Sequence, residues 1–92
     1  MNECEIGQIV RSKAGRDKGR WMLVVAMEGD YVFLADGDIR KISRPKQKKI
    51  KHVSKTQTVI TSIQKDILSN KKIQNAEIRK ILEPWQKKTR QD

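Results

Sequence analysis

A basic, glycine-containing segment enclosed by two apolar runs constrains the fold of this chain more than any other feature. Residues 11–20, Arg-Ser-Lys-Ala-Gly-Arg-Asp-Lys-Gly-Arg, lie between the runs Ile6–Val10 and Trp21–Met27. The second run is unbroken and contains adjacent valines, which favours a short strand with both faces covered. We therefore expect strands at residues 5–11 and 20–27, joined by a basic loop.

Three further strands are expected downstream, at residues 31–35, 39–42 and 46–53. Asp36-Gly37-Asp38 is typical of a tight hairpin turn. Pro45 interrupts strand pairing, because proline has no backbone N–H to donate. The lysines of the last strand are expected to point outward or along an edge, where lysine discourages unwanted strand pairing. Five short strands with tight turns predict a small barrel of the SH3-like size class.

From Thr56 the spacing of apolar residues becomes helical. Thr56 or Thr58 is the expected N-cap of a first helix. A second helix is expected to begin at Asn75 and to end near Leu82 or Glu83, because Pro84 disfavours continuation. The apolar stripe consists of Val59, Ile60, Ile63, Ile67, Ile78, Ile81, Leu82 and Trp85, with Leu68 beside it. This predicts a mostly β protein with a helical C-terminal tail.

The expected organisation is a barrel over residues 1–55 and a helical hairpin with a frayed tail over residues 56–92. Each helix is too short to be stable alone. The apolar stripe must therefore be buried on the barrel, within the hairpin or on a partner protein.

The net charge of +10 is concentrated in part of the chain. Residues 1–43 carry seven Lys or Arg and seven Asp or Glu, whereas residues 44–55 carry six basic residues and no acid. Clustered basic charge on a small domain is typical of a protein that binds a polyanion. A membrane surface would instead favour a basic amphipathic helix with large apolar anchors. Residues 44–55 do not form such a helix, so we expect no membrane partner.

Catalytic and metal chemistry have little support in the sequence. His52 is the single histidine and Cys4 the single cysteine, so an internal disulfide and a cysteine-based zinc site are excluded. The segment 14–19 lacks the Gly-Lys-Ser/Thr step of a P-loop. We expect no enzyme, no cofactor and no metal. No apolar run is long enough to cross a bilayer, and the first residues show no secretory signal, which favours the cytoplasm.

The stretch Gly7–Val25 resembles the KOW motif, a strand–basic loop–strand unit of ribosomal proteins and transcription-elongation factors. Gly7 matches the glycine that begins the first strand, Gly15 the loop glycine, and Lys18-Gly19 the step before the second strand.

Later segments extend the resemblance to about residues 5–54. Asp36-Gly37-Asp38, Arg44-Pro45-Lys46 and Lys49–Val53 are similar to the eukaryotic and archaeal large-subunit ribosomal protein fourteen family. Residues 75–82 are similar to the tail of bacterial KOW proteins, whereas the short hairpin departs from the longer extensions of the ribosomal members.

The resemblance implies an SH3-like barrel that binds RNA, in particular ribosomal RNA, as a ribosomal or ribosome-associated factor. It also implies a monomer outside that complex. Ribosomal proteins are further expected partners. Gly15 and Gly19 are the expected structural glycines of the loop. The candidate RNA-binding residues are Arg11, Lys13, Arg16, Lys18, Arg20, Arg44, Lys46, Lys48, Lys49, Lys51 and His52.

An alternative reading comes from another class of function. KOW barrels of transcription factors also bind proteins, and an exposed apolar stripe on the hairpin would offer a surface for a partner helix. In that reading the chain is an adaptor in a transcription or translation complex.

Overall fold

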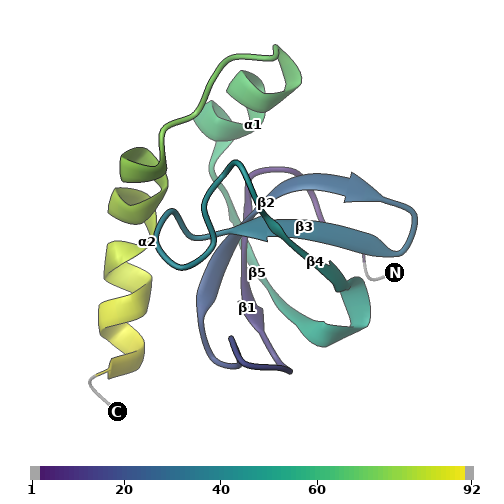
Figure 1. The fold of residues 1–92 in the computed structure, drawn as a ribbon, viewed down its shortest axis with the longest axis vertical. Helices are drawn as coiled ribbons and strands as arrows, with labels where there is room; N and C mark the ends of the chain where they lie inside the picture. Colours follow the sequence, from purple (N-terminus) through teal and green to yellow (C-terminus); the bar gives the residue numbers. More distant parts are fainter. Residues whose placement is uncertain (1–2, 91–92) are drawn as a thin grey trace.

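The computed structural model describes the backbone of residues 3–90 and the side chains of residues 3–87, as five strands, a short 3-10 helix and two α-helices (Figure 1). The elements are β1 (Gln8–Ser12), β2 (Trp21–Glu28), β3 (Tyr31–Ala35), β4 (Lys46–Lys49), the 3-10 helix η1 (Ile50–His52), β5 (Val53–Val59), α1 (Thr61–Leu68) and α2 (Asn75–Arg90). The strands form one antiparallel sheet in the order β4-β3-β2-β1-β5. The expected class, a small barrel-like β domain with a helical C-terminal part, is confirmed.

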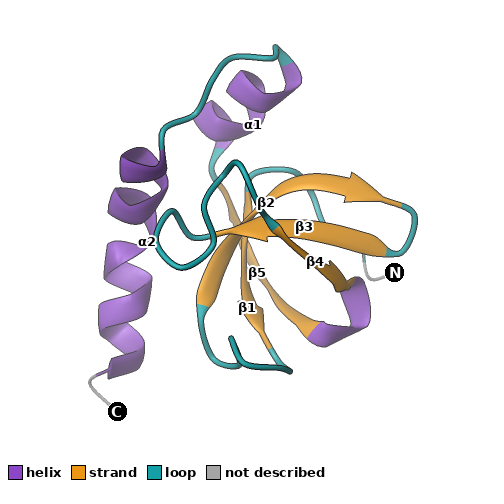
Figure 2. Ribbon diagram, in the orientation of Figure 1, coloured by secondary structure: helices purple, strands orange, loops and turns teal. Residues whose placement is uncertain are grey.

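The sheet has a core on each face, which explains the unbroken apolar run of β2. Met22 and Val24 belong to a cluster with Val10, Val32 and Leu34. The alternate residues Leu23 and Val25 belong to a second cluster, which includes apolar side chains of both helices. Successive side chains of a strand point to opposite faces. Residues 22–25 can therefore all be buried, because the curved sheet encloses one face and the helices cover the other (Figure 2).

The prediction of a fourth strand at residues 39–42 is wrong. Residues 37–40 form a series of bends, Ile42 lies in a turn, and Ile39 is 65% exposed. The cause is Asp36, whose Oδ1 accepts hydrogen bonds from the backbone N–H groups of Asp38 and Arg40 at 2.9 and 2.8 Å. This carboxylate occupies backbone donors that a partner strand would otherwise need.

The fifth expected strand, residues 46–53, is divided into β4 and β5 by η1. β5 then continues to Val59, so the helix expected from Thr56 starts only at Thr61. Neither predicted threonine is an N-cap. The Thr56 hydroxyl instead donates to the carbonyl of Ile9 at 2.7 Å, within the β1–β5 pair. The expected boundary between residues 55 and 56 therefore lies inside a strand.

Both helices pack on the sheet face that carries Leu23. Ile63 and Ile78 are fully buried there, and Leu82 is 1% exposed. Ile60, Ile67 and Ile81 are partly buried against the same cluster. Most of the apolar stripe of the C-terminal segment is thus covered by the barrel itself, whereas Leu68 is 68% exposed.

Helix α2 does not end before Pro84, as expected, but continues to Arg90. Its continuation coincides with contacts to the first residue of β2. The Trp85 and Trp21 rings lie 5.1 Å apart between centroids. The Gln86 amide donates to the Trp21 carbonyl at 2.8 Å and accepts from the Trp21 N–H at 3.2 Å. These contacts offset the cost of a proline inside the helix. The expected helix end near Leu82 or Glu83 is therefore wrong, and residues 91–92 lie outside the described part.

Candidate nucleic-acid interface

The basic loop between β1 and β2 is anchored by Lys48 of β4. The Lys48 ammonium donates to the Ser12 hydroxyl at 3.0 Å, the Ala14 carbonyl at 2.7 Å and Asp17 Oδ1 at 2.9 Å. Its side chain is only 7% exposed. The prediction that Lys48 points outward is therefore wrong, because its three donors are all satisfied by the loop.

Asp17 is the buried counter-ion of Lys48. Its Oδ1 also accepts a hydrogen bond from the Ser12 hydroxyl at 2.8 Å. Burial raises the pKa of Asp17, but hydrogen bonds from Lys48 and Ser12 and the charge of Lys48 outweigh it, so the pKa lies below its ordinary value. Its other oxygen, Oδ2, is buried without a hydrogen-bond partner among the described residues. The pair holds a charged loop in one position against β4.

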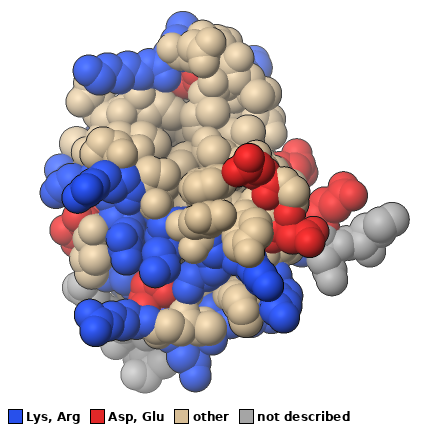
Figure 3. All heavy atoms as spheres, turned by 45° about the vertical axis from the view of Figure 1, so that its right-hand side comes forward, with Lys and Arg blue, Asp and Glu red and all other residues tan. Residues whose placement is uncertain are grey.

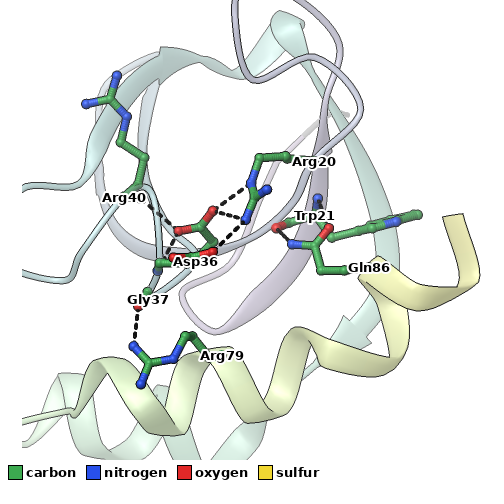
Figure 4. A network of polar contacts seen from close by, with 8 residues as sticks. Arg20, Trp21, Asp36, Gly37, Arg40, Arg79 and Gln86 are labelled. Atoms are coloured by element: carbon green, nitrogen blue, oxygen red, sulfur yellow. Dashed lines mark hydrogen bonds and ion pairs between the residues drawn. The ribbon is translucent and has the colours of Figure 1, made fainter. Parts of the chain in front are cut away.

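Two further predicted RNA-binding residues have structural contacts. Arg20 forms an ion pair with the buried Asp36 at 2.7 Å, which ties the end of the loop to the turn after β3 (Figure 4). Arg11 donates through Nε to the Gly19 carbonyl at 3.0 Å, and its guanidinium lies 5.2 Å from the centre of the Trp21 ring. Neither side chain is fully exposed.

The loop lies directly against η1 as well as β4. The backbone N–H of Lys13 donates to the His52 carbonyl at 2.9 Å. Gly15 and Gly19 both have positive φ, at 84° and 90°, in agreement with their expected role in shaping the loop. Two segments separated by more than thirty residues in the sequence are thus brought side by side.

The remaining predicted cations are accessible to a partner. Lys13, Arg16 and Lys18 of the loop are exposed, and so are Lys49 and Lys51 beyond it. Lys46 and His52 are half-buried. Arg44 is exposed but precedes β4, at the opposite end of that strand from η1.

Figure 3 shows Lys and Arg side chains gathered over the lower half of one face, with Asp and Glu mostly at its right-hand edge. Lys55, which is also exposed, was not among the predicted residues. Lys55 falls within the acid-free segment 44–55, and that signal was sufficient to include it.

Other kinds of site receive no support from the geometry. Within residues 3–90, no group of three His, Cys, Asp or Glu side chains is arranged to hold a metal ion. In the same range no helix combines the length and apolar character that crossing a membrane requires. Cys4 is 5% exposed, and burial raises the pKa of its thiol despite the opposing charge of Lys55. A buried, protonated thiol is a packing residue rather than a nucleophile.

No protein-family model matches the chain, and no curated protein is significantly similar to it in sequence.

Proposed function

We propose that this protein binds structured RNA, and ribosomal RNA in particular, through the face formed by the β1–β2 loop, β4 and η1. The observation that carries the proposal is the anchoring of the loop by Lys48. It brings the exposed Lys13, Arg16 and Lys18 beside a second basic segment that contains Lys49 and Lys51. Cations fixed on one surface neutralise several phosphates of a backbone and release its counter-ions.

We assign this activity to the cytoplasm and to a ribosomal or ribosome-associated factor, following the KOW resemblance of residues 5–54. The single buried cysteine agrees with a chain that functions without disulfides. In this proposal the protein makes no chemical change to the RNA. It docks through charge and shape and has no catalytic role.

The alternative function, a protein-binding adaptor, was based on an exposed apolar stripe on the helical hairpin. Its apolar stripe is packed on the sheet, where Ile63, Ile78 and Leu82 are buried. A partner helix could reach these side chains only by displacing α1 or α2. We therefore do not propose a protein-binding hairpin.

Salt dependence tests the electrostatic mechanism. If six to eight phosphates are neutralised, RNA affinity should fall by roughly a thousand-fold or more between low and moderate salt. The measurement is fluorescence anisotropy of a labelled ribosomal RNA fragment over a series of KCl concentrations. An affinity that is independent of salt would contradict the proposal.

A charge-matched set of variants tests the location. The triple variant Lys13→Gln, Arg16→Gln, Lys51→Gln removes three exposed cations of the proposed face. The control, Lys65→Gln, Lys71→Gln, Lys72→Gln, removes three exposed cations from α1 and the following loop. We expect the first variant to lose at least about a hundred-fold in affinity and the control to change little. Equal losses in both would show that only net charge matters.

A further inference from the structure

A groove separates the end of the basic loop from α2. It has a volume of about 760 Å³, and its walls come from the loop, the turn after β3 and one side of the helix. This volume falls in the range of sites that admit a small molecule or one unit of a polymer. The part contributed by the helix includes Arg79, Lys80 and Lys87, none of which the sequence had marked as functional.

Fixed contacts hold the groove open. Arg79 donates to the Gly37 carbonyl at 2.7 Å, which attaches α2 to the turn after β3 (Figure 4). The Arg20–Asp36 ion pair joins that turn to the basic loop. Gln86 attaches the far part of the helix to Trp21. The three walls are therefore connected to one another and do not depend on a ligand for their positions.

The groove carries an excess of positive charge that these contacts do not use. Lys and Arg outnumber Asp and Glu two to one among its lining residues. Both Asp36 and Asp38 already face Arg20, at 2.7 and 3.8 Å. Lys18 and Lys80 are exposed and form no ion pair with any described residue, and Lys87 has only a 3.8 Å contact with Glu83. An anionic ligand would be attracted by these three ammonium groups.

Lys18 connects the groove to the proposed RNA face, because it belongs to the exposed side of the loop and also lines the groove. A chain of phosphates lying on the loop can therefore continue past Lys18 toward Lys80 and Lys87. The exposed acids along this groove are Asp38, which faces Arg20 at 3.8 Å, and Glu83. This continuity favours a nucleic-acid strand over an isolated small anion.

We propose that this groove is a second contact site for the same RNA, in which α2 binds phosphates of a strand that leaves the loop face. The inference rests on the proposed RNA-binding function and adds to it a specific role for the C-terminal helix. Lys18, Lys80 and Lys87 are the phosphate-binding residues, whereas Glu83 opposes binding. Arg79 and Gln86 hold the helix in place.

The test uses the full chain and a fluorescein-labelled RNA hairpin with a single-stranded tail. The variant Lys80→Gln, Lys87→Gln should weaken binding about tenfold and reduce the slope of log affinity against log salt by about 1.5. Its matched control, Lys65→Gln, Lys72→Gln, removes the same charge from exposed positions outside both surfaces and should bind as the wild type does. Equal effects in the two variants would overturn the inference.

A gain-of-affinity variant excludes simple unfolding as the explanation. Glu83→Gln removes the acid that faces Lys87, and its side chain is 63% exposed. We expect it to bind the same RNA about twice as tightly, because repulsion of the phosphates is removed. A variant that merely disturbed α2 would bind less tightly, and unchanged or weaker binding by a folded Glu83→Gln protein would contradict the proposal.

The remaining outcomes distinguish failure of this inference from failure of the proposed RNA-binding function on which it rests. If the loop-face triple variant loses binding while the groove variants match their control, the groove is not used and the proposed function stands. If the wild type does not bind RNA at any salt concentration, both fall. Polyglutamate competition gives the last outcome. The inference is overturned if polyglutamate displaces the RNA, and the variant Lys80→Gln, Lys87→Gln loses polyglutamate binding but keeps its RNA affinity. The groove would then be a site for acidic peptides.

Discussion

At the scale of single residues, the position of Lys48 decides the character of the basic loop. A lysine that is almost fully buried must be paired, because an isolated ammonium is expensive to remove from water. Ser12, Ala14 and Asp17 provide that pairing, and all three lie at the start or within the loop. The buried Lys48 therefore holds in place the loop that carries the exposed cations.

Replacing Lys48 should reveal how strongly this pair is coupled. Lys48→Met keeps the length of the side chain but leaves the Asp17 carboxylate buried without its counter-ion, so we expect a loss of about 3 kcal/mol in the free energy of unfolding. Adding Asp17→Asn to the same chain should recover a substantial part of that loss, since no uncompensated charge then remains. Urea unfolding of the wild type, both single variants and the double variant measures the coupling. Additive losses would show that the two side chains act independently.

The lowered pKa of Asp17 predicts a specific pH dependence. A carboxyl group with a lower pKa in the folded state stabilises the protein above its unfolded pKa, and this contribution is lost as the pH falls through the folded pKa. The stability difference between the wild type and Asp17→Asn should therefore be largest near neutral pH and shrink below about pH 4. Urea unfolding at a series of pH values checks this. A gap that stays constant down to strongly acidic pH would assign the loss to something other than the charge.

At the scale of secondary structure, α2 takes over the role of a missing strand at the start of β2. The last β2–β3 pair in this direction is Leu23 with Ala35. Trp21 therefore lies beyond the end of β3, and its backbone N–H and carbonyl need another partner. The Gln86 side chain supplies a donor and an acceptor, as an amide of a neighbouring strand would (Figure 4). Together with the Arg79–Gly37 hydrogen bond, this contact anchors the helix on both sides of Pro84.

Removing the Gln86 amide should loosen this end of the helix. We expect Gln86→Ala to lower the free energy of unfolding by about 2 kcal/mol, because the two hydrogen bonds between its amide and the Trp21 backbone are lost. Lys87→Ala is the neighbouring control, since its single contact with Glu83 is exposed and should contribute little. Thermal unfolding and amide hydrogen exchange of Trp21 report the difference. Equal stability of the two variants would contradict this role for Gln86.

The turn after β3 approaches α2 so closely that only glycine fits at position 37. A Cβ on Gly37 would overlap the carbonyl oxygen of Asn75 and lie 3.1 Å from the Arg79 nitrogen. Gly29 also has a positive φ, but a Cβ there would meet nothing within 4 Å. Gly29→Ala should therefore cost about 1 kcal/mol from backbone strain alone, and Gly37→Ala should cost at least about 2 kcal/mol more. Comparable melting temperatures for the two variants would show that α2 can move away without loss.

At the scale of the whole molecule, the barrel and the helices share one core. Ile9, Leu23 and Ala35 of the sheet are buried together with Ile63, Ile73 and Ile78. In a small domain, loss of one face of the sheet leaves too little buried apolar surface for stability. We therefore expect the helices to be required for folding as well as for the proposed groove.

This shared core predicts a single cooperative transition. Far-UV circular dichroism of the strands and helices and the fluorescence of Trp21 and Trp85 should give coincident urea unfolding curves for the full chain. A fragment ending at residue 60 exposes the outer face of the sheet, and we expect it to be unfolded or aggregated. A folded, monomeric fragment would show that the barrel is an independent domain.

The sequence alone determined the local features of this protein. The β-branched runs placed three of the strands, the glycines marked the loop, and the apolar periodicity located both helices, because strand and helix periods are properties of neighbouring residues. Lys13, Arg16 and Lys18, which the sequence marks as candidate RNA-binding residues, are exposed.

Only the tertiary structure decided which charges face inward and where the elements end. Lys48 and Lys49 are adjacent in a lysine-rich segment, and the pleat of β4 together with Asp17 buries one and exposes the other. Asp36 prevented a strand at residues 39–42, and Trp21 held α2 together beyond Pro84. In each case the deciding partner lies far along the chain or competes for backbone hydrogen bonds, and local pattern does not contain that information.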